Sequence, residues 1–504
     1  MMAVVYWPAL LLSQICVLLI VLSSIYHFCL AYISSQLWAP AVHYDYIVVG
    51  SGSAGSVVAG RLAGGGHRVL LVEAGGPAPA LAHIPGMVAG LQRSVLDWSY
   101  RTEQQDSAVL SSGGVSIWPR GKVLGGSSIL NYMLYMRGHS RDYDEWRDAG
   151  LEGWGYQDVL QYFKRSEQME SDIPDKEKFH GTDGELTVTK DNFKEPIIDV
   201  YMKAAEELGY KVGDINGELE DEGFSPSQVS LRNGVRTGTY KAFAEKESSN
   251  NLTVLTFAHA SKLLFEGKTA VGVEVIRFGK TQQFFSSQEV IVSAGSIGSP
   301  QLLMLSGIGD KHQLEEVGVK PFHHLPEVGR NLQDHLLVPV CFDTPDPLSI
   351  QLEDSFLPSS WIQYLSGSGP LTSTGGLPGV AHINTKQGGG RPDVQLHLLA
   401  LTGATDFGLL LKDNLGLTEE AWPWQSPHSD KYSNAIAPTL SRPKSRGELK
   451  LRSKDPFDHP VIKPNYLSEQ EDVDTLVGGI KVVLNMFNTT AMREAGAELW
   501  QVLF

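Results

Sequence analysis

A glycine motif directly after a short apolar strand is the feature that most constrains how this chain can fold. Residues 44–49 form a β-branched and aromatic run without internal proline or glycine, which predicts a buried parallel strand. The run continues into a G-x-G-x-x-G motif at 50–55, and residues 56–63 are small and apolar enough for a helix packed closely on a sheet. A second strand is predicted over 68–72. This order predicts a β-α-β unit of a Rossmann-like α/β domain.

Each glycine of the motif has a physical role in binding a dinucleotide. Gly50 permits the tight turn, Gly52 lets backbone N–H groups approach a pyrophosphate, and Gly55 lets the helix press on the strand. Glu73 ends the second strand, at the position where a carboxylate accepts hydrogen bonds from an adenosine ribose. These residues predict a dinucleotide site, but they do not separate NAD from FAD, because both cofactors contain ADP.

A second segment rich in glycine and serine lies at residues 121–138. It contains paired glycines, paired serines and then an apolar stretch that includes Asn131. This pattern predicts a loop followed by a helix, whose N-terminus offers backbone donors to an anionic or carbonyl-rich ligand. The segment is therefore a second predicted ligand contact.

The same segment resembles the first signature of the glucose-methanol-choline (GMC) oxidoreductase family, and residues 295–309 resemble the second. Residues 327–335 are similar to the segment that follows the second signature, and shorter matches continue in order over roughly 44–490. The similarity is to the choline-dehydrogenase-like and animal glucose-dehydrogenase-like branches. It implies an α/β fold, α+β overall, in which a Rossmann-like FAD-binding domain is interleaved with an antiparallel-sheet substrate domain.

The resemblance implies FAD as the cofactor and assigns residues to it. The glycine motif and Glu73 would hold the ADP part, Val123 and residues 131–134 would border the flavin, and the backbone of Ala260 would contact the adenine. Some family members tether FAD through a histidine at the position of Leu130, so FAD is expected to be non-covalent here. The full set of predicted cofactor-binding residues is Gly50, Gly52, Gly55, Glu73, Val123, Gly126, Asn131, Tyr132, Met133, Leu134 and Ala260. No metal site is predicted.

The family pattern also predicts how the chain divides into domains. Residues 44–335 would be mostly the FAD-binding domain, 336–440 the substrate or cap domain, and 441–504 the start of the family's C-terminal region. Residues 1–43 would be a leader outside the folded part.

The leader is expected to meet a membrane. Residues 1–44 contain no Asp, Glu, Lys or Arg, and residues 9–33 are almost continuously apolar. A cleaved signal peptide and a signal anchor both fit this pattern. We expect entry to the secretory pathway, an extracellular or membrane-anchored product, and membrane contact through the leader only.

Charge and motifs limit the classes of function. The formal net charge is −16, and an acidic surface repels phosphate backbones, so no nucleic-acid partner is expected. The leading hypothesis is an FAD-dependent oxidoreductase that acts on the CH–OH group of a small-molecule alcohol, by hydride transfer to flavin N5, with an unidentified electron acceptor. The alternatives are a non-catalytic flavin-binding or interaction protein and, more weakly, an NAD-dependent dehydrogenase.

No catalytic residue is assigned from the sequence. The family's catalytic histidine and its His or Asn partner lie after the segment that matches residues 464–467, whereas after Leu440 the sequence has only His459. We therefore expect the chain as given to lack this pair and to oxidise alcohols well below a normal rate, as an incomplete product or an alternative C-terminus would. His335, His397 and His459 are the first residues to test should turnover be observed.

Overall fold

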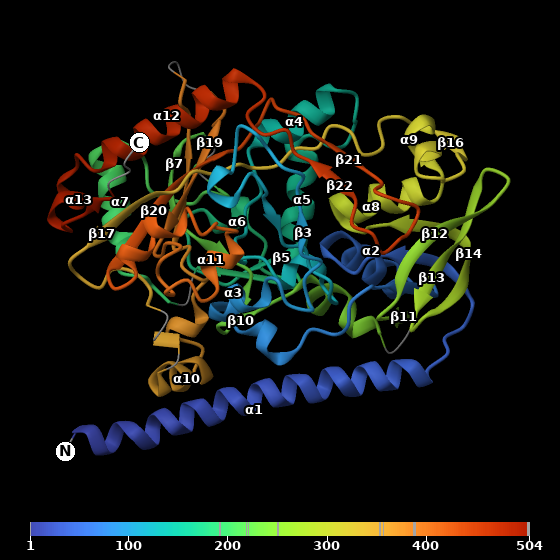
Figure 1. Ribbon diagram of the computed structural model, residues 1–504, viewed down its shortest axis with the longest axis horizontal. Helices are drawn as coiled ribbons and strands as arrows, with labels where there is room; N and C mark the ends of the chain where they lie inside the picture. The colour runs from blue at the N-terminus through green and yellow to red at the C-terminus, as the bar shows by residue number, and fades with distance from the viewer. Residues whose placement is uncertain are drawn as a thin grey trace.

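The computed structural model describes residues 2–500, except for 191–192, 218, 220, 249–250, 352–353, 356 and 387–389. Two large sheets organise the described chain, each with helices packed against it, and a long N-terminal helix lies along one side of the body (Figure 1). The first sheet contains the predicted dinucleotide motif, and the second forms the other half of the molecule.

The first sheet has four parallel strands followed by an antiparallel extension. Its strand β1 (His43–Val49) lies between β2 and β14, and α2 (Ser53–Gly64) follows β1 directly, which confirms the predicted strand–helix–strand unit. The strands in spatial order are β11 (Leu252–Leu255), β2 (Val69–Val72), β1, β14 (Lys280–Val292), β13 (Thr269–Arg277) and β12 (His259–Glu266).

Three parallel strands of this sheet end at the same edge. Val49 pairs with Val72 on one side and with Val292 on the other. The N-termini of α2 and of α8 (Gly295–Leu305) follow β1 and β14 at this edge. Ligands of open α/β sheets bind at the carboxyl ends of the strands, so this arrangement positions the candidate site.

The second sheet is antiparallel throughout. One face packs on α7 (Ile197–Glu207), α12 (Gln470–Met486) and α13 (Thr490–Glu494), with Tyr201 and Phe342 fully buried between them. Together the two sheets confirm the predicted fold class. The strands in spatial order are β23 (Glu498–Leu499), β17 (Val340–Thr344), β20 (Tyr432–Leu440), β19 (Val394–Leu399), β18 (Gly379–Ile383) and β7 (Gly223–Pro226).

The prediction of a helix after the paired serines is wrong. A single turn, η4 (Gly126–Ile129), is followed by extended chain, and Met133 has a positive φ of 61°. The backbone N–H of Tyr135 donates to the carbonyl of Gln228 at 2.8 Å, and Leu134 forms a bridge with Val229. Pairing with this distant strand satisfies the backbone groups that a helix would have satisfied locally.

The N-terminal helix α1 (Met2–Leu37) lies beside the folded body and contacts α10 (Pro358–Leu365) (Figure 1). Over Leu18–Leu37 its mean hydropathy is 1.7, so by length and composition it is apolar enough to cross a membrane. Near its C-terminal end, Phe28 and Tyr32 pack edge-on against Phe257 with ring centroids 5.4 and 5.2 Å apart.

A buried charged network joins four side chains from different parts of residues 137–214. The guanidinium of Arg137 donates to Glu167 at 2.6 Å, and His180 lies 3.0 Å from Glu167 and 2.8 Å from Asp214. All four side chains are almost completely excluded from solvent. With His180 protonated, two cations face two carboxylates, and the network is electrically neutral.

This network predicts how stability depends on pH. Burial lowers the pKa of His180, but hydrogen bonds and charges from Asp214 and Glu167 outweigh burial and raise the pKa above its ordinary value. The stabilisation is therefore complete below about pH 6.5 and is lost as pH rises through the raised pKa, by about 1.4 kcal/mol for each pH unit between the pKa values of the unfolded and folded states. Urea unfolding between about pH 6 and 9 should show a His180-dependent decline in the free energy of unfolding. An identical slope in His180→Gln would contradict this.

Candidate functional site: a dinucleotide cavity

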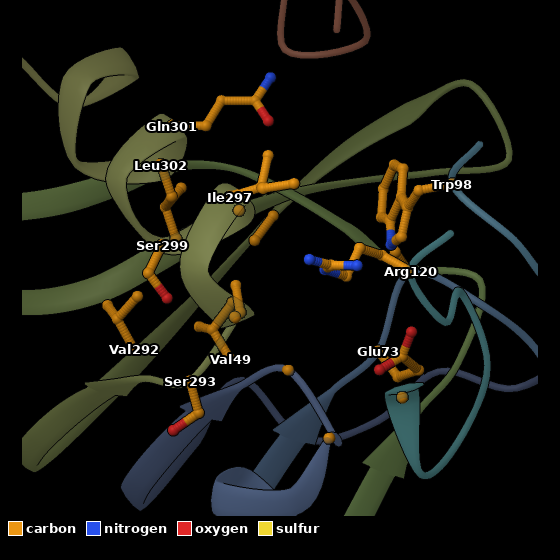
Figure 2. Close-up of a pocket in the computed structure, with 18 of the residues that line it drawn as sticks. Val49, Glu73, Trp98, Arg120, Val292, Ser293, Ile297, Ser299, Gln301 and Leu302 are labelled. Atoms are coloured by element: carbon orange, nitrogen blue, oxygen red, sulfur yellow. The ribbon is translucent and has the colours of Figure 1, made fainter. Parts of the chain in front are cut away.

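A cavity of about 520 Å³ opens at the carboxyl edge of the first sheet. Figure 2 shows Val49, Val292 and the side chains of α8 on one side, with Trp98 and Arg120 on the other. Glu73 lies at the edge below Arg120. The cavity therefore lies where strand ends and two helix N-termini direct backbone N–H groups toward a ligand.

The two glycine-rich segments that the sequence predicted separately meet in this cavity. Gly126 has a φ of 55°, and a Cβ there would lie 2.7 Å from the Cα of Gly52. Gly50 has a φ of 98°, and its Cβ would lie 2.5 Å from the carbonyl oxygen of Ser293. Side chains at these positions would fill the space between the loops. The missing Cβ atoms leave a cradle of backbone, which fits a dinucleotide phosphate.

Glu73 lies in the cavity as a buried carboxylate that is already partly hydrogen-bonded. It accepts bonds from the N–H of Ser51 at 3.1 Å, from the Ser51 hydroxyl at 2.6 Å and from the N–H of Gly75 at 2.8 Å. Burial raises its pKa, although these hydrogen bonds act in the opposite direction. A carboxylate has about four acceptor sites, so one remains for the predicted ribose contact.

The predicted cofactor residues divide into those that line the cavity and those that do not. Gly55 supports the loop instead, since a Cβ there would overlap the carbonyl oxygen of Gly50. Val123 is fully buried, and its carbonyl accepts a bond from the N–H of Gly126 at 2.7 Å. The predicted residues that line the cavity are Gly50, Gly52, Glu73, Gly126 and Ala260.

Residues 131–134 are not brought into this cavity. Asn131 is exposed, Met133 is fully buried against Val229, and Leu134 packs beside it. Between Gly126 and Leu134 the chain therefore leaves the cavity, and Leu134 pairs with Val229. Leu130, at the position that suggested a non-covalent flavin, is buried in a hydrophobic cluster.

Arg236 is a residue that the sequence analysis missed. It is completely buried, and its Nη1 donates to the carbonyls of Ser128 and Asn131 at 3.2 and 2.7 Å and to Asn131 Oδ1 at 2.9 Å. Its Nε and Nη2 have no hydrogen-bond partner among the described groups. Burial lowers its pKa to about 9. A buried cation without a counter-charge next to residues 128–131 fits an anionic cofactor. No local sequence motif indicates that Arg236 lies there.

The histidines differ in their relation to the site. Among the described residues, His259 is the histidine that lines the cavity, and its Nε2 lies 3.0 Å from the carbonyl of Pro456. Burial lowers the pKa of His259. Its ring nitrogen is therefore engaged with the backbone. His459 lies against Tyr100 in the cavity wall, with ring centroids 4.7 Å apart.

His397 lies on β19, on the sheet face opposite the hydrophobic core. Gln395, two residues earlier and hence on the same face, donates to the sulfur of Met136 at 3.2 Å. This face of β19 is therefore the one that contacts Met136, two residues after the 131–134 segment. Burial, with a smaller contribution from His335, lowers the pKa of His397 to about 4, so its imidazole is neutral near pH 7.

Comparison with known proteins identifies the class. Models of the GMC oxidoreductase family match residues 44–337 and 443–502. The chain belongs to the GMC oxidoreductase family, as its two signature segments predicted.

Individual relatives cover most of the chain. Glucose dehydrogenase (FAD, quinone) of Drosophila pseudoobscura pseudoobscura is 39% identical over 477 residues, which are 91% of this chain and 72% of the relative. Choline dehydrogenase, mitochondrial, of Homo sapiens is 36% identical over 473 residues, 89% of this chain and 74% of the relative. The crystal structure of pyridoxine 4-oxidase from Mesorbium loti has a TM-score of 0.76 at 27% identity and covers 91% of this chain and 83% of its own.

The contact between the two glycine loops predicts that one added methyl group, at Gly126, weakens cofactor binding. Gly126→Ala should weaken FAD binding by about tenfold or more, because the new Cβ must displace the Gly52 backbone and the positive φ becomes strained. Quenching of flavin fluorescence measures the dissociation constant. The matched control is Gly90→Ala, where a Cβ meets nothing within 4 Å. Equal affinities in the two variants would show that the close contact does not matter for binding.

Proposed function

We propose that this chain binds FAD non-covalently and oxidises the CH–OH group of a small-molecule alcohol. The observation that carries the proposal is the backbone contact between Gly52 and Gly126, which joins the dinucleotide loop to the first family signature around one cavity. Bound FAD supplies the hydride acceptor that amino-acid side chains lack. Membership of the GMC oxidoreductase family supports the same conclusion.

The residues divide the work of holding the cofactor. Gly50, Gly52 and the N-terminus of α2 would bind the pyrophosphate, Glu73 would accept a ribose hydroxyl, and the Ala260 backbone would contact the adenine. Residues 131–134, fixed from behind by Arg236, would border the flavin. Leu130 offers no nucleophile, which supports non-covalent binding.

The alternatives are less well supported. Binding of NAD would explain the first glycine loop. It would not explain why the second glycine loop packs against the first. A non-catalytic flavin protein is not favoured, because family models match both the N-terminal and the C-terminal regions of an oxidoreductase.

We also propose the domain division 44–335, 336–440 and 441–504. Strands β17 to β20 of the second sheet come from the middle block, which supports a substrate domain there. The remaining strands β7 and β23 come from the flanking blocks, which supports interleaving.

The apolar helix α1 supports entry to the secretory pathway, with the product either released or kept at the membrane. An uncharged helix of this length is costly to leave in water. Both the cleaved form and the anchored form remain within this proposal.

An absorbance spectrum of the purified chain tests the cofactor. We expect flavin bands, and acid precipitation should release all of the flavin into the supernatant, because no covalent tether is available at Leu130. Protein that binds no flavin even after incubation with FAD would contradict the proposal. Flavin that precipitates with the protein would contradict non-covalent binding only.

The sequence assigns no catalytic base, and His459 is the one histidine after Leu440. For the slow turnover that the sequence predicts, we propose His397 as the group that accepts a hydrogen bond from the alcohol hydroxyl. Its imidazole is neutral near pH 7 and lies on the sheet face that looks toward residues 131–136. His397→Asn should slow anaerobic flavin reduction by an alcohol panel about 10²-fold, within the usual range for a lost acid–base group. The exposed His323 provides the control, His323→Asn. A His397→Asn rate within about twofold of wild type would contradict the assignment.

A further inference from the structure

We propose that α10 is a second membrane contact, so that Ile362 and Leu365 enter the same lipid leaflet as the outward side chains of α1. The docking face is defined as Ile362 and Leu365 together with Leu18, Leu22, Ile25 and Ile33 of α1. Its partner is a bilayer of zwitterionic lipid. The inference concerns the chain that keeps α1 and goes beyond the expectation that only the leader meets a membrane. It does not depend on the proposed flavin chemistry.

Packing of Trp361 fixes the orientation of α10, yet two of its aliphatic side chains are exposed. Trp361 is 6% exposed in a hydrophobic cluster, and its Nε1 donates to the carbonyl of Ser355 at 3.1 Å. Ile362, the next residue, is 68% exposed, and Leu365, one turn after Trp361 at the end of α10, is 86% exposed. Leaving two large aliphatic side chains in water on an otherwise anchored helix forgoes the free energy of their burial.

α10 packs beside α1. Ile20 packs on the cluster that contains Trp361 and Leu371, so the two helices share one hydrophobic contact (Figure 1). A second attachment, of Phe28 and Tyr32 on Phe257, lies further along α1. These two attachments hold α1 along the body rather than perpendicular to it. Its exposed apolar side chains therefore lie near α10.

The charge distribution selects lipid over a charged protein partner. Charged residues make up 19% of the chain, yet residues 1–44 and 355–385 contain no Asp, Glu, Lys or Arg. These uncharged segments include both α1 and α10. A surface without charges gains nothing from an acidic or basic partner, whereas zwitterionic lipid provides a hydrocarbon layer that needs no counter-charge.

Site-directed fluorescence on the full-length chain tests the contact directly. In a Cys16→Ser, Cys29→Ser, Cys341→Ala background, Ile362→Cys carries an environment-sensitive dye, and Leu151→Cys provides a control that is 53% exposed elsewhere. With phosphatidylcholine vesicles that contain a doxyl-lipid quencher, the dye at 362 should shift to the blue and be quenched, while the dye at 151 should not. Vesicle-bound protein with an unquenched dye at 362 would overturn the proposal.

Vesicle flotation of unlabelled variants measures the contribution of α10 to binding. Ile362→Ser with Leu365→Ser should bind vesicles about tenfold more weakly than wild type at an unchanged melting temperature, since less apolar surface enters the lipid. Leu151→Ser with Leu110→Ser, also exposed, should bind as wild type does. Equal binding by all three proteins would overturn the proposal. So would a lipid-free dimer that the α10 variant dissociates, because the face would then join two copies of the chain.

Discussion

The contact on which the rest of the site depends is the approach of two backbones at Gly52 and Gly126. At this point the loop after β1 and the first residue of η4 touch without side chains between them. The parallel strands β1, β2 and β14 fix the first loop by ending at one edge, and the N-terminus of α2 adds partial positive charge there. The dinucleotide cavity depends on this contact, because Gly52 and Gly126 both line it.

The second loop is held by interactions from distant parts of the chain. Arg236 binds the carbonyls of Ser128 and Asn131, and the N–H of Tyr135 joins the same segment to Gln228. Beyond it, Arg137 enters the buried network with Glu167 and His180. Removing one member of a buried ion pair typically costs about 3–5 kcal/mol, so this network ties the geometry of the loop to the stability of the fold.

Local sequence was sufficient for the parts of the fold that local physics determines. The β-α-β unit and Glu73 at the end of β2 follow from periodicity and glycine placement, and the structure contains them. The segment at 131–134 was predicted wrongly as helix, because its partner strand lies almost 100 residues away in sequence. Arg236 was missed for the same reason. The roles of the individual cofactor residues stay predictions, since they require a bound ligand to test.

Hydrogen exchange of the apoprotein with and without FAD tests the central claim most directly, because it reports on both glycine loops in one experiment. If the contact between Gly52 and Gly126 forms one cradle, FAD should slow exchange in residues 50–56 and in residues 121–134 together, and NAD should not reproduce the second effect. Protection confined to residues 50–56, or the same protection of both loops by NAD, would contradict a single flavin cradle built from two glycine loops.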